Sequence, residues 1–269
     1  MPKVWLITGA SSGFGRALAH AATLRGDIAI ATARNIDGVK DFAHRFHLDV
    51  TDPESVRHAV SSAIEAHGRI DFVVNNAGHG LVGVTEEVSD DSLRDLLETN
   101  LFGVWRVTRE VLPHFRRQGG GHFVQMSSVG GIVGNPGHAA YATSKFALEG
   151  MSEALAGEVA GFGIGVTIVE PGPFRTEFAG RSLDTTEALT DYTDTPGGVL
   201  RAAFRDQDGR QPNDPTLAAE AIIKAVTSAH PPLRLPLGPE AITRIRTKLR
   251  NQLDEIDQWE ALAAATRFE

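Results

Sequence analysis

The stretch KVWLITGASSGFG, residues 3–15, decides the fold of this chain. Its apolar run VWLI predicts a buried strand, and the glycines that follow open a helix expected at 13–24. Gly9 permits a tight turn, Gly13 lets the backbone approach a ligand closely, and Gly15 allows the helix to pack against the strand. A flexible turn is the alternative interpretation. The strand–turn–helix order favours a dinucleotide site, because a helix N-terminus offers free N–H groups to phosphate.

The rest of the chain alternates strands and helices with short connections. Further strands are expected at 28–32, 46–50, 70–78, 121–128 and 163–172, and helices at 53–67, 90–111, 139–161 and 239–269. The strands are apolar throughout, which predicts a parallel sheet covered on both faces. One segment, 182–215, is irregular and rich in Thr, Asp, Gly and Pro, as is typical of a lid or binding loop.

Composition narrows the class of protein. The chain has 269 residues, 42% hydrophobic, with a net charge of -8 and no cysteine. An acidic chain without a basic run is a poor partner for nucleic acid or an anionic membrane. No apolar stretch approaches the ~18 residues that span a bilayer. We therefore expect a cytoplasmic protein.

Four motifs occur in order, each at an expected strand or helix end: TGASSGFG (8–15), NNAG (75–78), YATSK (141–145) and PG (171–172). Together they resemble the short-chain dehydrogenase/reductase family in its single-domain branch, from residue 4 to about 180. The resemblance implies one Rossmann-type α/β domain over 1–269, a doubly wound parallel sheet of about seven strands with helices on both faces. The lid insertion then spans about 177–215 and a helical tail follows.

The end of the second strand, ATARN, bears on the cofactor. In the family an acidic residue here marks NAD, and the alignment puts Ala33 at that position with Arg34 next. A guanidinium binds a 2′-phosphate through charge-assisted hydrogen bonds of roughly 1.5–3 kcal/mol, so we expect NADP (NADPH), with NAD less favoured. A solvated Arg34 is the alternative. Asp49 matches the adenine-contacting aspartate of the family, or caps the next helix.

The resemblance implies a cofactor site formed by Gly9, Ser11, Ser12, Gly13, Phe14, Gly15, Arg34, Asp49, Val50, Asn76, Ala77, Gly78, Tyr141, Lys145, Pro171, Gly172 and Thr176. For Pro171 and Gly172, a simple strand stop is a compatible reading.

The same resemblance implies four catalytic residues: Asn100, Ser128, Tyr141 and Lys145. Tyr141 and Lys145 are i and i+4 neighbours on a helix, and a surface pair is the alternative. A nearby ammonium is expected to lower the tyrosine pKa and so permit acid–base catalysis. In the family the serine holds the substrate oxygen and the lysine also binds ribose. Asn100 then holds a water next to Lys145, or merely satisfies a helix kink.

These residues predict an NADP-dependent oxidoreductase acting on a secondary alcohol or ketone. The region expected to cover the substrate contains Phe174, Phe178, Leu183, Leu189, Tyr192, Leu200 and Phe204, which indicates an apolar pocket with a mobile cover. The overall pattern resembles family members that act on lipophilic, steroid- or retinoid-like carbonyls. A non-catalytic NADP-binding regulator and a sugar-nucleotide epimerase are the alternatives.

Other signals say less about function. His44 and His47 lack further ligands at metal spacing, so no metal site is expected. A homodimer or homotetramer is expected through helices 90–111 and 139–161. The charges of the tail are interpreted as a solvated helix face.

Overall fold

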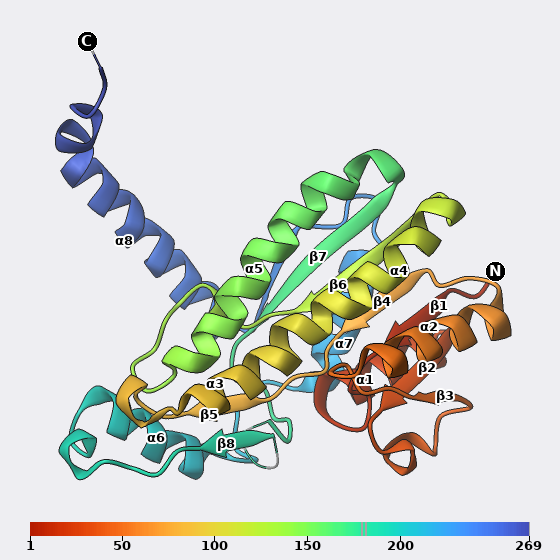
Figure 1. Ribbon diagram of the computed structural model, residues 1–269, viewed down its shortest axis with the longest axis horizontal. Helices are drawn as coiled ribbons and strands as arrows, with labels where there is room; N and C mark the ends of the chain where they lie inside the picture. Colours follow the sequence, from red (N-terminus) through yellow and green to blue (C-terminus); the bar gives the residue numbers. More distant parts are fainter. Residues whose placement is uncertain (179, 181, 269) are drawn as a thin grey trace.

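A computed structural model describes residues 1–178, 180 and 182–268. Its centre is a seven-stranded sheet in the order β3-β2-β1-β4-β6-β7-β9, in which every neighbouring pair is parallel. The chain order reverses between β1 and β4, as in a doubly wound sheet. The predicted Rossmann-type α/β fold is therefore confirmed (Figure 1). The strands are β1 Val4–Ile7, β2 Ile28–Ala33, β3 His44–His47, β4 Phe72–Asn75, β6 Gly121–Met126, β7 Ile164–Pro171 and β9 Arg234–Leu237.

Helices cover both faces of the sheet. One apolar core joins the sheet to α1 and α7, and a second joins it to α2, α4 and α5. The helices are α1 Gly13–Leu24, α2 Pro53–His67, α3 Asp90–Leu97, α4 Val104–Gln118, α5 Ala139–Val159, α6 Pro196–Gln207, α7 Pro215–Val226 and α8 Pro239–Ala264. Short 3₁₀ segments occur at Ile36–Val39, Thr85–Glu87, Val129–Gly131, Ala160–Phe162 and Thr190–Tyr192. This layering leaves the carboxyl ends of the strands open to form a site.

Two predicted boundaries were wrong. The third strand was expected at 46–50, but β3 is His44–His47, an edge strand whose side chains are mostly exposed and therefore carry no apolar pattern. The helix expected at 90–111 is α3 and α4 joined by a π-helical segment, Glu98–Gly103, and it continues to Gln118.

The lid is more ordered than its composition predicted. It contains a short strand, β8 Leu183–Thr185, which pairs in parallel with β5 Gly80–Val82 outside the main sheet, and the helix α6. Pro196 occupies the first turn of α6, a favoured place for proline, so this residue opens a helix where we had expected an irregular loop. Ala179 and Arg181 of the expected lid, and Glu269 of the tail, lie outside the described residues.

The tail is helical, as predicted. It forms α8, which extends away from the body of the molecule (Figure 1). Within the described part of the chain, none of the helices has the length and apolar character to cross a bilayer.

Candidate active site

The glycine turn between β1 and α1 has the conformation that its sequence requires. Gly9 and Gly13 have φ of 64° and 53°, in the left-handed region that favours glycine. A Cβ on Gly15 would lie 2.4 Å from Asn76 Nδ2, so only glycine fits there. Asn76 Nδ2 itself donates to the carbonyl oxygens of Thr8 (2.9 Å) and Gly9 (3.1 Å). The NNAG motif thus fastens the end of β4 to this turn.

The N-terminus of α1 is suited to an anion. Ser12 is the N-cap, but within the described part of the chain its side chain makes no capping bond, and the first turn carries no acidic residue. The backbone N–H groups there remain available to a phosphate. Opposite them, Thr176 lies 3.5 Å from the position of a Cβ on Gly13. The glycine turn and the segment after β7 therefore lie side by side at the start of α1. Of the other residues predicted here, Ser11 packs against Gly38 and Phe14 lines the cavity described below.

Arg34 follows β2 and Asp49 follows β3, and the two side chains are close enough for the charge of Arg34 to act on the Asp49 carboxylate. Arg34 is exposed and, among the described residues, forms no hydrogen bond or ion pair. The Asp49 carboxylate accepts hydrogen bonds from the Thr51 N–H (2.9 Å) and hydroxyl (2.8 Å). Burial raises the pKa of Asp49, but these bonds and the charge of Arg34 outweigh it and lower the pKa. Asp52 is the cap of α2, so the capping alternative for Asp49 was wrong. Val50 is buried beside it.

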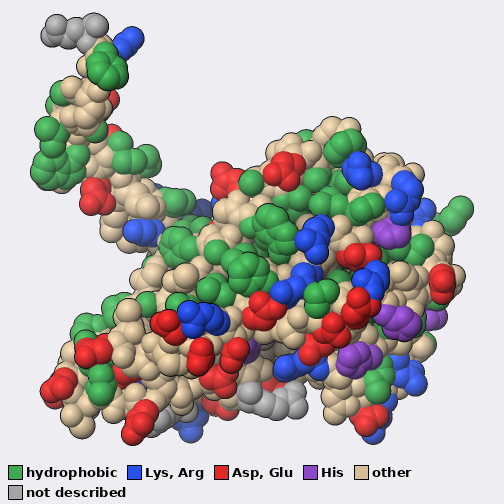
Figure 2. All heavy atoms as spheres, in the orientation of Figure 1, with side chains coloured by type: hydrophobic (Ala, Val, Ile, Leu, Met, Phe, Trp, Pro, Cys, Tyr) green, Lys and Arg blue, Asp and Glu red, His purple; other side chains and the backbone are tan. Residues whose placement is uncertain are grey.

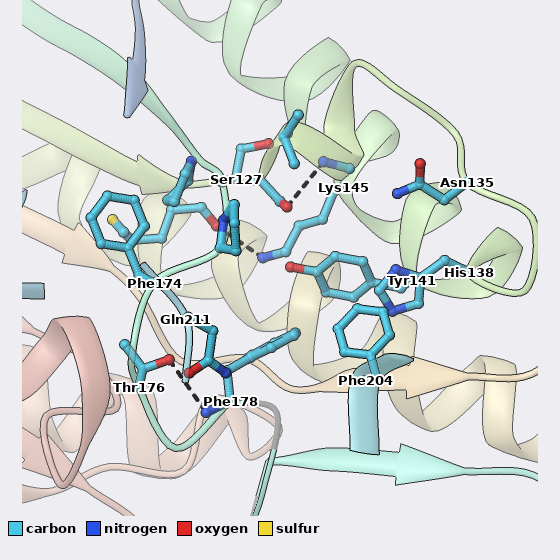
Figure 3. Close-up of a pocket in the computed structure, with 18 of the residues that line it drawn as sticks. Ser127, Asn135, His138, Tyr141, Lys145, Phe174, Thr176, Phe178, Phe204 and Gln211 are labelled. Carbon is cyan, nitrogen blue, oxygen red and sulfur yellow. Dashed lines mark hydrogen bonds between the residues drawn. The ribbon is translucent and has the colours of Figure 1, made fainter. Parts of the chain in front are cut away.

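Tyr141 and Lys145 are not a surface pair. They are only 6% and 7% exposed, and the ammonium of Lys145 lies 5.8 Å from the Tyr141 ring centre. Lys145 Nζ donates to the Met126 carbonyl oxygen at 2.8 Å, which holds it at the end of β6. The Ser128 hydroxyl accepts from the Gly130 N–H at 3.0 Å and hydrogen-bonds the Tyr141 side chain. Figure 3 shows the Tyr141 hydroxyl and the Lys145 side chain pointing toward each other.

Burial sets the protonation of this pair. It raises the pKa of Tyr141 to about 12, and the hydrogen bond from Ser128 offsets only part of that effect. It lowers the pKa of Lys145 to about 8, against the charge of Glu149. The expected lowering of the Tyr141 pKa by Lys145 was therefore wrong. At neutral pH Tyr141 carries its proton and Lys145 is mostly cationic, which suits proton donation.

Asn100 lies in the π-helical segment and is completely buried. Its Oδ1 accepts from the His79 N–H at 3.0 Å, and its Nδ2 donates to the His79 carbonyl oxygen at 2.9 Å and to Ser144 Oγ at 3.1 Å. Gly78 passes so close that a Cβ there would lie 2.9 Å from Asn100 Oδ1. These contacts join the NNAG turn to α5 and agree with the kink alternative. A water between Asn100 and Lys145 stays a prediction.

Comparison of the sequence and the fold with known proteins identifies the family. A family profile described as short chain dehydrogenase matches residues 3–187. The chain belongs to the short-chain dehydrogenase family. It is 41% identical to oxidoreductase BOA17 of Botryotinia fuckeliana over 90% of this chain and 91% of that protein. It is 38% identical to a 3-ketodihydrosphingosine reductase of Bacteroides thetaiotaomicron over 88% of each chain. A solved short-chain dehydrogenase from Streptomyces avermitilis superposes with a TM-score of 0.93 at 42% identity, over 99% of this chain and 98% of that one.

A cavity of about 300 Å³ adjoins the Tyr141 hydroxyl of this dehydrogenase. Several aromatic side chains line it. The His138 ring lies 4.9 Å from Tyr141 and 4.8 Å from Phe204, and Phe178 lies 5.5 Å from Tyr141, between ring centres. Pro171 and Gly172 line the same cavity at the end of β7, where Gly172 passes close to α8. Of the residues expected to cover the substrate, four line the cavity: Phe174, Phe178, Leu200 and Phe204. Leu183, Leu189 and Tyr192 are not among the lining residues.

The cavity wall also carries polar groups, which sequence reasoning missed. Arg244 of α8 donates to Asn135 Oδ1 at 2.5 Å and, among the described residues, pairs with no carboxylate. His138 Nε2 and Gln211 Oε1 are buried there, and the described residues offer neither a hydrogen-bond partner. Burial, and then the charge of Arg244, lower the pKa of His138 to about 4, so its ring is neutral at pH 7. These groups come from three segments that are distant in sequence, so no local spacing could have indicated them.

The lid is held to the body by Glu87, which the sequence also did not single out. Its carboxylate accepts from the Leu189 N–H (2.9 Å) and the Thr186 hydroxyl (3.1 Å) and pairs with Arg201. Its side chain is fully buried. Burial raises the pKa of Glu87, but these bonds outweigh it and bring the pKa to about 2. The anchor fixes α6, whose Leu200 and Phe204 close the cavity.

Proposed function

We propose that this chain is an NADP-dependent oxidoreductase that interconverts a secondary alcohol and a ketone, with Tyr141 as general acid and base. The observation that carries the proposal is the meeting of the Tyr141 hydroxyl, the Ser128 hydroxyl and the Lys145 ammonium beside an apolar cavity. A fold hosts many functions, so the site rather than the sheet supports this assignment.

Each residue has a stated task in ketone reduction. A bound nicotinamide supplies the hydride to carbon. The Ser128 hydroxyl holds the substrate oxygen, and Tyr141, neutral at pH 7, donates its proton to that oxygen. Lys145 stabilises the phenolate that remains. In alcohol oxidation the same proton returns to Tyr141.

The glycine turn, the uncapped start of α1, Asp49 and the NNAG turn supply the groups that a dinucleotide requires. The preference for NADP rests on Arg34, whose guanidinium forms no hydrogen bond or close ion pair among the described residues, and on the absence of a carboxylate at Ala33. A 2′-phosphate bound there would gain charge-assisted hydrogen bonds.

The cavity supports a substrate class as well. Its aromatic side chains favour a lipophilic carbonyl, and the relative from Bacteroides is named for the reduction of a 3-keto compound. The Arg244 guanidinium in the cavity wall, held by Asn135, favours a substrate with an acceptor group, such as a carboxylate, away from the reacting carbon.

Assembly and location complete the proposal. Phe102 and Trp105, which precede and begin α4, and Phe146 of α5 are 49%, 52% and 46% exposed, which supports an oligomer formed through these two helices. A chain without cysteine fits a reducing compartment such as the cytoplasm.

The test is NADPH oxidation over a panel of ketones and aldehydes of increasing bulk. Tyr141→Phe should lower turnover by roughly 10²- to 10⁴-fold and keep NADPH binding. The chain has only two tyrosines, so Tyr192→Phe, at a half-buried position outside the cavity lining, is the matched control and should keep turnover. Equal turnover in wild type and Tyr141→Phe would refute the assignment. NADPH binding without turnover on any carbonyl would favour the non-catalytic regulator.

A further inference from the structure

The first turns of α8 pack against the rest of the molecule, whereas the described residues of its C-terminal part are exposed. Ala241 and Ile245 are buried and pack with Val129 of the site. From Leu249 to Phe268 every residue is exposed. Figure 1 shows this part of α8 leaving the sheet and its covering helices. A helical segment of about this length is marginal in water without packing, so its stability requires a partner surface.

The projecting part of α8 carries an apolar face. Leu249, Leu253, Ile256 and Trp259 follow one another at spacings of four, three and three residues and are 50%, 60%, 62% and 55% exposed. Residues three and four apart share one face of a helix, so these side chains form a stripe. Figure 2 shows hydrophobic side chains gathered along this arm. A contiguous exposed stripe of large apolar side chains is the signature of a protein contact.

The charges of α8 are sorted by sign along its length. We call residues 244–250 the basic half, because they carry four cations and no acid, and 254–260 the acidic half, because they carry four acids and no cation. The cations are Arg244, Arg246, Lys248 and Arg250, and the acids are Asp254, Glu255, Asp257 and Glu260. In the described part of the chain, none of the charges from 246 to 260 forms an ion pair. The solvated-face interpretation overlooked this segregation.

This order of charges does not favour an isolated helix. Cations are stabilised near a helix C-terminus and anions near its N-terminus, and α8 has the reverse arrangement. The arrangement becomes favourable only when a second helix presents its acidic half to the basic half of the first. Another copy of α8 does so if it runs antiparallel, whereas a parallel copy would place like charges side by side.

We infer that α8 pairs antiparallel with α8 of a second copy of this chain, in a two-fold symmetric contact centred near Leu253. In this register Leu249 of one copy packs against Ile256 of the other. Arg246 lies beside Glu260 of the second copy, and Lys248 beside its Glu255. Such self-complementary contacts close on themselves and give a defined pair rather than a filament. An anionic lipid surface is a poorer occupant, because the acidic half flanks the stripe.

This contact is distinct from the one proposed at α4 and α5, and it does not depend on the chemistry of the site. Both contacts together predict a tetramer with two kinds of two-fold interface. The α8 pair would also support the first turns of α8, which bring Arg244 to the cavity.

The first test measures the mass of the full chain by sedimentation velocity. Leu253→Asp with Ile256→Asp places two charges in the stripe and should halve the mass. The matched control, Asn251→Asp with Gln258→Asp, adds the same charge on the opposite face of α8 and should leave the mass unchanged. A monomeric wild type, an unchanged mass in the stripe variant, or an equal loss in the control would overturn the inference.

The second test measures the relative orientation of the two α8 helices. Because the sequence has no cysteine, an introduced cysteine is the sole thiol that can react. With a short thiol cross-linker, Leu253→Cys should form a covalent dimer, because this residue lies near its own symmetry mate. Leu262→Cys should not, because nine residues on either side of the centre separate the two thiols by about 27 Å. Efficient dimerisation of Leu262→Cys, or none of Leu253→Cys in a chain that keeps its mass, would overturn antiparallel pairing.

Discussion

The substitution Glu87→Gln should detach the lid while leaving the body of the molecule intact. Glu87 is fully buried and binds three lid residues, Thr186, Leu189 and Arg201. The glutamine keeps the size of the side chain and one acceptor oxygen, but it removes the charge that neutralises Arg201. Breaking a buried ion pair by removing one partner costs about 3–5 kcal/mol.

That cost falls mainly on the segment 186–201, which supplies Thr186, Leu189 and Arg201. The fourth partner, the Val84 N–H at 2.9 Å, belongs to the turn that carries Glu87 itself. Since each 1.4 kcal/mol is a factor of ten, the open population should rise by roughly 10²- to 4 × 10³-fold. Amide hydrogen exchange measures this directly: protection in α6 should fall by that factor, while the amides of β4 and β6 keep theirs. Because α6 closes the cavity, KM for the best ketone should rise as well.

The neighbouring acid provides the control. Glu86 is partly exposed and accepts from the Tyr192 hydroxyl at 2.7 Å, so Glu86→Gln should change stability by no more than about 1 kcal/mol. The double variant Glu87→Gln with Arg201→Met removes both charges and should recover part of the loss. Unchanged α6 protection in Glu87→Gln, or an equal change in Glu86→Gln, would refute the anchor.

The same anchor has a defined pH dependence. A carboxyl whose pKa is lowered to about 2 from an ordinary 4.5 stabilises the folded state fully above the ordinary value. This contribution is lost as the pH falls through about 2. Protection of α6 in the wild type should therefore decline from about pH 5 downward, whereas Glu87→Gln should lack this dependence.

Three further predictions concern the site. Ala33→Asp with Arg34→Ala should invert the preference between NADPH and NADH in binding titrations, and an unchanged affinity ratio would reject the 2′-phosphate role. Arg244→Met should raise KM for keto acids by roughly 10- to 100-fold while sparing the matching methyl esters, because a charge-assisted hydrogen bond is worth about 1.5–3 kcal/mol; an equal effect on both would show that Arg244 only shapes the cavity. Lys145 is cationic below its pKa of about 8, so kcat for ketone reduction should fall as the pH rises through that value. A profile that stays flat to about pH 9.5 would contradict the need for its charge.

Local patterns predicted most of the fold. Strands that are apolar on both faces are typical of a parallel sheet covered by helices, and a glycine turn after such a strand opens a helix. The positions of β1 and α1 and the parallel sheet could therefore be predicted from the sequence. The edge strand β3 did not, because its exposed side chains follow no apolar period. The buried Leu48 and Val50, just beyond it, shifted the prediction by two residues at the start.

Some residues of the candidate site could likewise be predicted from local spacing, and others could not. Tyr141 and Lys145 could be paired because i and i+4 residues meet on any helix, whereas Ser128 required the family resemblance. The polar groups of the cavity wall, Asn135, Gln211 and Arg244, come from separate loops and helices, which no window of sequence records. The direction of the Tyr141 pKa shift also required the structure, because it depends on how far the side chain is buried away from water.

Burial determines which protonation states of Tyr141 and Lys145 are favoured before and after proton transfer. Before reaction it penalises both charged forms, so the proton stays on Tyr141 and the pKa of Lys145 falls to about 8. Once Tyr141 has given its proton to the substrate oxygen, a phenolate and an ammonium stand together in the same water-poor site. Their attraction is several-fold stronger there than in water. The environment that keeps the acid protonated at rest therefore also stabilises the ion pair that the proton transfer leaves behind, and a solvent-exposed Tyr–Lys pair at the same spacing would do neither.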